Sequence, residues 1–275
     1  FFLYLPHFAV HTPIQGRADL VAKYQARIRE GMRHRNAAYA AMTESLDTAV
    51  GRVVATLERL RLRERTIIVF TSDNGGRITQ GTTTNQPLRL GKASAYEGGV
   101  RVPLIINWPR VIQRGGVSDA PVITMDLFPT LVELAGLPAS AARTAVDGVS
   151  LAGHLRGGPV PRRATLFWHY PHHQHYQLGG AMPYAAIRAG DYKLIEFYND
   201  LKDIRLELYN LRADSGETRD LAATEPGRVA EMRAQLHVWQ REVGAQMPVT
   251  NPAYQPTKPE YTPPPAKAKK GAARG

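Results

Sequence analysis

Cysteine is absent from this sequence of 275 residues. Disulfide bonds, thiolate metal sites and cysteine nucleophiles are therefore excluded within it. Aromatic residues are also few, at 8%, but hydrophobic residues make up 43% of the chain. That share is large enough for a packed core and argues against global disorder. The length suits one large α/β domain, or a domain with a smaller appendage.

Long hydrophobic runs are missing as well. The first apolar run, Phe1–Leu5, ends at Pro6, and neither a basic segment nor an initiator methionine precedes it. It is too short for the hydrophobic part of a signal peptide or for a membrane span. We interpret it as a buried strand. We expect the chain to be a fragment whose upstream part would carry any export signal.

Acidic residues are outnumbered, with 24 Asp and Glu against 35 Lys and Arg, which gives a formal net charge of +11. The segment from Asn251 onward contributes +4, because it holds five basic residues and the single acid Glu260. A basic protein attracts anionic ligands by long-range steering. The sequence has no aromatic-basic platform or recognition-helix pattern, so nucleic acid is not the expected partner.

Three parts of the chain differ in composition and in predicted secondary structure. Over residues 1–161 helices and strands alternate, which predicts an α/β body: a helix over Asn36–Leu62 and strands over Thr66–Thr71 and Val102–Trp108. Residues 162–247 predict a small antiparallel sheet and one helix, with strands at Thr165–Trp168, Tyr184–Arg188, Tyr192–Phe197 and Leu206–Tyr209 and the helix at Pro226–Glu242. Residues 248–275 are rich in Pro and Lys and predict a disordered tail.

Asp73 and Asn74 directly follow the predicted strand Thr66–Thr71. In α/β sheets, ligands gather beyond the carboxyl ends of the strands. Carboxylate and amide oxygens suit a hard cation such as Ca²⁺ or Mg²⁺. The alternative is a plain Asp-Asn-Gly turn, since these residues tolerate left-handed backbone.

Two further positions carry candidate chemistry. Lys92 lies on a glycine-flanked loop, where it can deliver a positive charge to an oxyanion or remain a solvated lysine. In the same loop, Glu97 and Arg101 are expected to form an ion pair. His11 follows the first apolar run and precedes Thr12-Pro13, so it is a candidate general acid near neutral pH, although a lone histidine is often structural.

Taken together, these segments resemble the sulfatase family of the alkaline-phosphatase superfamily. The resemblance extends from Phe1 to about Glu242. The matching segments are residues 1–13, 39–51, 68–76 (Ile-Val-Phe-Thr-Ser-Asp-Asn-Gly-Gly), 92–103, 187–194 and 207–211. It implies an alkaline-phosphatase-like sandwich with a central mixed sheet, followed by the small C-terminal subdomain of the family.

The resemblance also implies roles for individual residues. Asp73 and Asn74 match the second pair of calcium ligands of the family. Lys92 matches the lysine that binds the sulfate group and the bridging ester oxygen, and His11 matches the histidine near the leaving-group oxygen. The implied activity is hydrolysis of sulfate esters, from sulfated carbohydrates or aryl sulfates, in the periplasm or outside the cell.

The sequence departs from the family at the nucleophile. Sulfatases use a formylglycine made from Cys or Ser in a Cys/Ser-x-Pro-x-Arg motif, and no such motif occurs in these 275 residues. The first pair of calcium-binding aspartates is missing too. We therefore expect half of the calcium site here and no catalysis from this chain alone. The alternatives are a phosphonate or phosphodiester hydrolase of the same superfamily, or a non-catalytic module that binds sulfated glycans.

Histidines cluster at Trp168-His169-Tyr170-Pro171-His172-His173. Imidazole and aromatic rings suit the pocket that receives the alcohol part of the substrate. We predict that His169, His172 and His173 line this pocket. A surface cluster of histidines, or an adventitious metal site, is the alternative.

Overall fold

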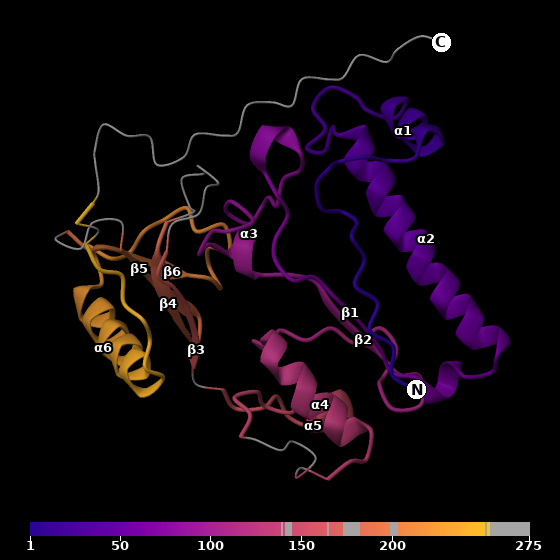
Figure 1. Cartoon of the computed structure of the whole chain (residues 1–275). Coiled ribbons are helices and arrows are strands. Elements are labelled where there is room, and N and C mark those ends of the chain that lie inside the picture. Colours follow the sequence, from indigo (N-terminus) through magenta and orange to yellow (C-terminus); the bar gives the residue numbers. More distant parts are fainter. Residues whose placement is uncertain are drawn as a thin grey trace.

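The structure is a computed structural model that describes residues 1–138, 140, 145–163, 165–172, 182–198, 203–250 and 252–253. Two packed helices lie in the N-terminal part of the chain. Helix α1 (Ala18–Gln25) packs against the longer α2 (Ala37–Arg59) at one end of the molecule (Figure 1). Lys23 of α1 pairs with Glu44 of α2 at 2.7 Å. Helix α1 was not predicted from the sequence.

Helix α2 confirms the helix predicted over Asn36–Leu62. The side chain of Asn36 accepts a hydrogen bond from the Tyr39 N–H at 3.0 Å, which satisfies one of the free donors at a helix start. Ala41 and Met42 lie on the buried side of the helix. A one-turn 3₁₀ helix, η1 (Arg63–Arg65), then leads into the first strand.

Strands β1 (Ile68–Thr71) and β2 (Leu104–Asn107) pair antiparallel, with Ile68 opposite Asn107. The two strands confirm the predicted positions. Among the described residues, β1 has one paired neighbour, and its side chains are partly exposed. The prediction of a buried strand at Phe1–Leu5 is wrong, since no described residue pairs with it and its side chains are exposed.

The connection from β2 to the C-terminal sheet is built on Asp126. It contains the 3₁₀ helix η3 (Thr124–Asp126), α4 (Leu127–Leu134) and α5 (Ala152–Leu155). Asp126 is 1% exposed, and its carboxylate accepts hydrogen bonds from the Ile123 and Val149 N–H groups and pairs with Arg163. This buried carboxylate ties residues 149–163 to α4.

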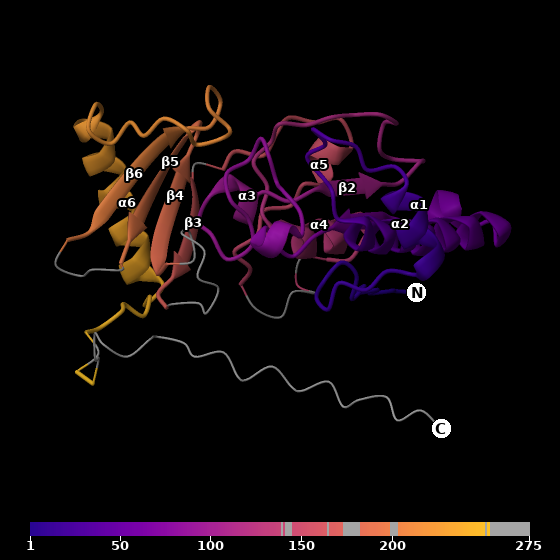
Figure 2. The same cartoon turned by 90° about the horizontal axis from the view of Figure 1, so that it is seen from above.

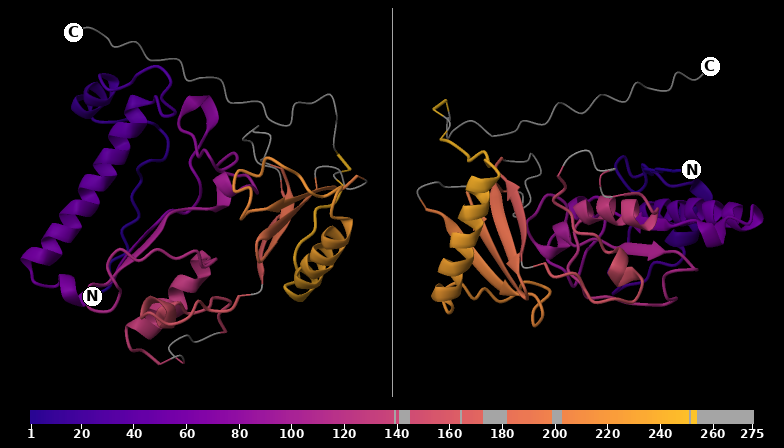
Figure 3. Two further views of the ribbon diagram at one scale, coloured as in Figure 1. Left: turned by 180° about the vertical axis from the view of Figure 1, so that it is seen from behind. Right: turned by 90° about the horizontal axis from the view of Figure 1, so that it is seen from below.

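The C-terminal part is a four-stranded antiparallel sheet in the order β3-β4-β5-β6. Its elements agree with the predicted positions: β3 (Thr165–Tyr170), β4 (Tyr184–Ala189), β5 (Tyr192–Phe197), β6 (Arg205–Asn210) and helix α6 (Pro226–Glu242). Figures 2 and 3 show the sheet between α6 and the rest of the molecule.

Each face of this sheet has its own apolar cluster. On one face, Leu194 and Leu208 pack with Val229, Met232 and Leu236 of α6. On the other face, the cluster joins Ala95 and Tyr96 of the Lys92 loop to sheet residues Tyr184, Ala186, Ile195, Phe197 and Tyr209. The sheet therefore packs directly against the segment that carries a candidate site residue.

The α/β class is confirmed, with the small antiparallel sheet and helix following the body. The predicted tail falls almost entirely outside the described residues, and the boundary near residue 161 stays a prediction. No helix within the described part of the chain is long and apolar enough to cross a membrane.

The exposed apolar residues at the start of the chain generate a first prediction. Phe1 is 86%, Phe2 83% and Phe8 71% exposed, and such a patch promotes self-association. We expect the triple change of these phenylalanines to Ser to raise the concentration at which the chain stays monomeric in light scattering. Val117→Ser, at a single residue that is 94% exposed, is the control and should change nothing. Equal association of both variants would contradict the assignment of this patch.

Candidate functional site

The loop after β1 presents two oxygen-bearing side chains. Asp73 is exposed and Asn74 is half-buried. The Asn74 N–H donates to Asp73 Oδ1 at 2.9 Å, and Ser72 Oγ donates to the Asn74 carbonyl at 3.0 Å. These bonds fix the turn. Among the described residues, they leave Asp73 Oδ2 and the Asn74 side-chain amide available to a ligand.

Lys92 is held beside this loop by main-chain hydrogen bonds. Its N–H donates to the Gly76 carbonyl at 3.1 Å, and the Gly75 N–H donates to the Gly99 carbonyl at 2.9 Å. The Asn85 side chain reinforces the junction, because its Oδ1 accepts from the Gly76 N–H at 3.0 Å and its Nδ2 donates to the Gly76 carbonyl at 2.9 Å. The structure thus brings together the segments of three predicted site residues: Asp73, Asn74 and Lys92.

Glycines allow the two segments to touch through their backbones. A Cβ added to Gly75 would lie 1.7 Å from the Gly98 carbonyl oxygen, and a Cβ added to Gly98 would lie 2.3 Å from the Leu90 carbonyl oxygen. Gly98 belongs to the short helix α3 (Glu97–Val100). The loop with Asp73 and Asn74 therefore rests on α3 at a distance that only glycine permits.

His11 has only local contacts among the described residues. Its side chain is exposed, its Nδ1 lies 3.0 Å from the Thr12 carbonyl oxygen, and its ring meets Phe8 edge-on at 5.7 Å. No described contact joins it to Lys92 or Asp73. Its convergence with the other site residues stays a prediction.

The two histidines of the predicted cluster that the structure describes have different surroundings. His169 belongs to β3 and contacts α6 and the segment after it, with Nε2 2.8 Å from the Gln246 carbonyl oxygen and Nδ1 3.3 Å from Gln240 Nε2. His172 is exposed, and its ring lies 4.1 Å from that of Tyr170. His173 lies outside the described residues. Of the three predicted pocket residues, His169 therefore contacts the C-terminal scaffold through both ring nitrogens.

Glu97, the first residue of α3, is 3% exposed and lies in a cluster of buried charges. Lys193 Nζ of β5 lies 3.0 Å from both Glu97 Oε1 and Glu217 Oε1, and the Glu97 N–H donates to Glu217 Oε2 at 2.7 Å. The expected ion pair of Glu97 with Arg101 is wrong, because the Glu97 carboxylate instead pairs with Lys193. Burial raises the pKa of the Glu217 carboxyl above its ordinary value, and the charge of Lys193 opposes that shift.

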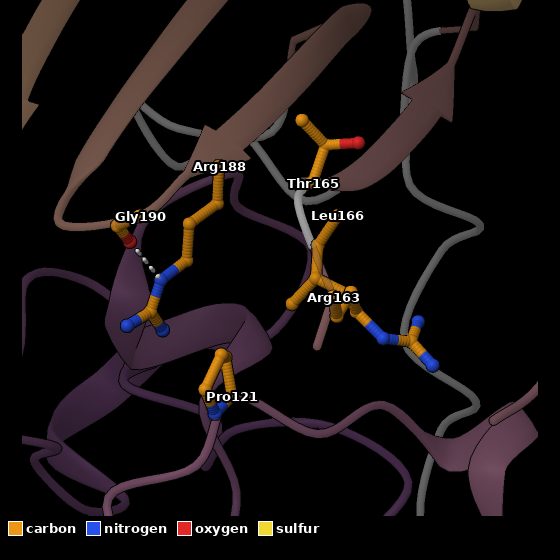
Figure 4. A pocket seen from close by; sticks show the side chains of 6 residues that line it. All are labelled: Pro121, Arg163, Thr165, Leu166, Arg188 and Gly190. Carbon is orange, nitrogen blue, oxygen red and sulfur yellow. Dashed lines mark hydrogen bonds between the residues drawn. The ribbon is translucent and has the colours of Figure 1, made fainter. Parts of the chain in front are cut away.

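Neither of two surface hollows contains the candidate site. One lies beside the start of β3 and is lined by Pro121, Arg163, Thr165, Leu166, Arg188 and Gly190; Arg188 Nε donates to the Gly190 carbonyl at 3.3 Å (Figure 4). The other, of about 420 Å³, lies between residues 86–90 and 216–218. Within the described residues, no group of three or more His, Asp or Glu side chains is arranged to hold a metal ion.

Comparison with known proteins identifies a family for this chain. The family description "Sulfatase" matches residues 1–137, and "N-sulphoglucosamine sulphohydrolase, C-terminal" matches residues 90–244. A sulfatase of Formosa agariphila is 40% identical over 259 residues, which cover 87% of this chain and 46% of that protein. The chain thus spans less than half the length of this relative.

Solved structures give the same fold. Ps i-CgsB in complex with k-i-k-neocarrahexaose is 28% identical with a TM-score of 0.69, covering 84% of this chain and 48% of that one. A complex of another protein with its substrate D-glucosamine-2-N,6-O-disulfate is 25% identical with a TM-score of 0.63, covering 84% and 47%. The fold and the loops around Lys92 thus define an alkaline-phosphatase-like α/β protein. The chain belongs to the sulfatase family.

The contact between Gly75 and α3 generates a second prediction. Gly75→Ala places a methyl group against a main-chain carbonyl that cannot rotate away, so we expect it to cost about 2–4 kcal/mol of unfolding free energy. Gly51→Ala on α2 is the matched control: nothing lies within 4 Å of its added Cβ. A helix-interior Gly→Ala change should gain about 0.5–1 kcal/mol. Urea unfolding measures both, and an equally benign Gly75→Ala would contradict the described packing.

The raised pKa of Glu217 generates a third prediction. A carboxyl whose pKa is higher in the folded than in the unfolded state stabilises the fold below its unfolded pKa, and this contribution is lost as pH rises through the folded pKa. The unfolding free energy of the wild type minus that of Glu217→Gln should therefore fall with rising pH across this window. Urea unfolding at a series of pH values measures the difference. A difference that grows with pH would show that Lys193 lowers the pKa of Glu217 more than burial raises it.

Proposed function

We propose that this chain supplies the lysine that binds sulfate, and part of the calcium site, of an enzyme that hydrolyses sulfate esters. The observation that carries the proposal is the junction of Lys92 with the Asp73-Asn74 loop through the Gly76 carbonyl, in a chain of the sulfatase family. Among the described residues, the Lys92 ammonium group has no ion-pair partner. It is available to an anion.

The donor set of the loop fits calcium in part. Asp73 and Asn74 offer carboxylate and amide oxygens, which hard cations prefer, but calcium takes about six to eight oxygen ligands. The remaining ligands must therefore come from elsewhere. When bound, calcium would supply positive charge next to the sulfate oxygens.

Lys92 and His11 have distinct tasks in this proposal. The Lys92 ammonium group binds the sulfate oxygens and the bridging ester oxygen as a compact charge, and it is already in place before charge develops on the leaving oxygen. His11 donates a proton to that oxygen as a general acid. The Cys/Ser-x-Pro-x-Arg motif is absent from these 275 residues. We therefore propose that turnover requires the part of the family's length that this chain does not cover.

The proposed substrate is a sulfated carbohydrate. Similar proteins were solved with a neocarrahexaose and with a glucosamine disulfate, and the net charge of +11 favours anionic ligands. His169, His172 and His173 are proposed to line the pocket for the alcohol part, and His169 of β3 also contacts Gln240 of α6. A periplasmic or secreted location is proposed only because members of the family are commonly exported.

Two substitutions test the assignment in the complete enzyme, defined as this chain together with the rest of the family's length. Asp73→Ala and Lys92→Ala should each lower calcium-dependent turnover of an aryl sulfate by about 100-fold or more, because each removes charge stabilisation at the reacting group. Asp47→Ala and Lys23→Ala, on α2 and α1, are the matched controls and should retain activity. The 275-residue chain alone should show no turnover. Full activity of Asp73→Ala or Lys92→Ala, or turnover by the chain alone, would contradict the proposal.

A further inference from the structure

Three buried charges join the C-terminal sheet to the candidate site. Lys193 is fully buried on β5, and its ammonium group lies 3.0 Å from a carboxylate oxygen of both Glu97 and Glu217. Glu97 comes from the Lys92 loop, 96 residues away along the chain, and Glu217 from the loop after β6. The cluster therefore fastens α3 to two separate elements of the C-terminal part.

A second layer of polar contacts surrounds this cluster. Tyr96, next to Glu97, donates its hydroxyl to Glu207 Oε2 of β6 at 2.7 Å. Arg89 donates to the Glu217 carbonyl at 3.0 Å and to the Tyr209 hydroxyl at 2.7 Å, and its guanidinium lies 4.0 Å from the centre of the Tyr96 ring. The chain is thus anchored to the sheet on both sides of Lys92, at Arg89 and at Tyr96-Glu97.

The buried charge cluster is connected to the Asp73-Asn74 loop through backbone contacts alone. Glu97 opens α3, and its neighbours Gly98 and Gly99 meet Gly75, whose N–H donates to the Gly99 carbonyl at 2.9 Å. No flexible side chain intervenes between this contact and Asp73-Asn74. A shift of α3 therefore moves the Asp73-Asn74 loop and the Lys92 loop relative to each other.

We propose that Lys193, clamped between Glu97 and Glu217, is a positioning residue that sets the geometry of Asp73, Asn74 and Lys92 from the C-terminal sheet. Lys193 does not touch the substrate. It acts through α3, so its removal loosens the candidate site while the sheet and α6 keep their own apolar cluster. The effect on turnover rests on the proposed sulfatase function, whereas the effect on the loops does not.

The test compares Lys193→Met with Lys23→Met in the complete enzyme. Lys23→Met removes an ion pair of the same type from the α1–α2 surface, at 2.7 Å from Glu44. Two readouts are taken: kcat and KM on an aryl sulfate at saturating calcium, and amide hydrogen exchange at Gly75, Lys92 and Gly99. We expect Lys193→Met to lower kcat by about 100-fold, as small misplacements of catalytic groups do, and to speed exchange at these amides. Lys23→Met should change neither.

A second variant covers the case in which Lys193→Met fails to fold, since it leaves two buried carboxylates facing each other. The triple change Glu97→Gln, Lys193→Met and Glu217→Gln removes the buried charges together, which proteins tolerate far better than a lone unpaired charge. It should fold, with fast exchange at Gly75, Lys92 and Gly99 and reduced kcat. Wild-type exchange in a folded variant overturns the positioning role. A wild-type enzyme that turns over neither an aryl sulfate nor a sulfated carbohydrate defeats the proposed function instead, and the exchange readout still decides the role of Lys193.

Discussion

The Lys193 ammonium group between the Glu97 and Glu217 carboxylates is the contact on which the arrangement of this protein depends. All three groups are buried, so each is stable only because the others are present. Removing one partner from such a cluster typically costs about 3–5 kcal/mol, while replacing all members by neutral groups often costs little. The cluster therefore contributes less to net stability than to the choice of one arrangement: it fixes where the C-terminal sheet meets the Lys92 loop.

This constraint explains why a small antiparallel sheet accompanies the α/β body. One face of the sheet is covered by α6, and the other packs on Ala95 and Tyr96, three and four residues after Lys92. At the glycines 75, 98 and 99, the backbones of α3 and of the Asp73-Asn74 loop are in direct contact. The position of α3 therefore determines the position of this loop. Three segments far apart in sequence thus pack together, and the residues with candidate chemistry belong to two of them.

Local sequence patterns were sufficient for most of the elements. The sequence predicted α2 as a helix over Asn36–Leu62, and it predicted the two strands that form the hairpin of β4 and β5. Helix α1 was missed because it has no buried residue and depends on packing against α2. Phe1–Leu5 has the composition of a strand, but a strand also needs a paired neighbour, which apolar composition alone does not reveal.

The candidate site was predictable only in part, and for a related reason. Asp73, Asn74 and Lys92 lie in short motifs that can be read locally, whereas the partner of Glu97 depends on the tertiary fold. The nearby Arg101 was the natural choice by sequence distance, yet the carboxylate pairs with Lys193, 96 residues away. One signal was present: Lys193 and Glu196 are charged residues inside the otherwise apolar and aromatic strand Tyr192–Phe197, and buried charges of this kind require partners.

The position of calcium in the complete enzyme tests the central claim most directly. A crystal structure with calcium and sulfate, with the metal located by its anomalous scattering, would show both ligands at once. The account predicts side-chain oxygens of Asp73 and Asn74 at about 2.3–2.6 Å from the ion, as calcium ligands lie, with the Lys92 ammonium group on a sulfate oxygen. Calcium bound away from Asp73 and Asn74, or a sulfate that Lys92 does not contact, would contradict it.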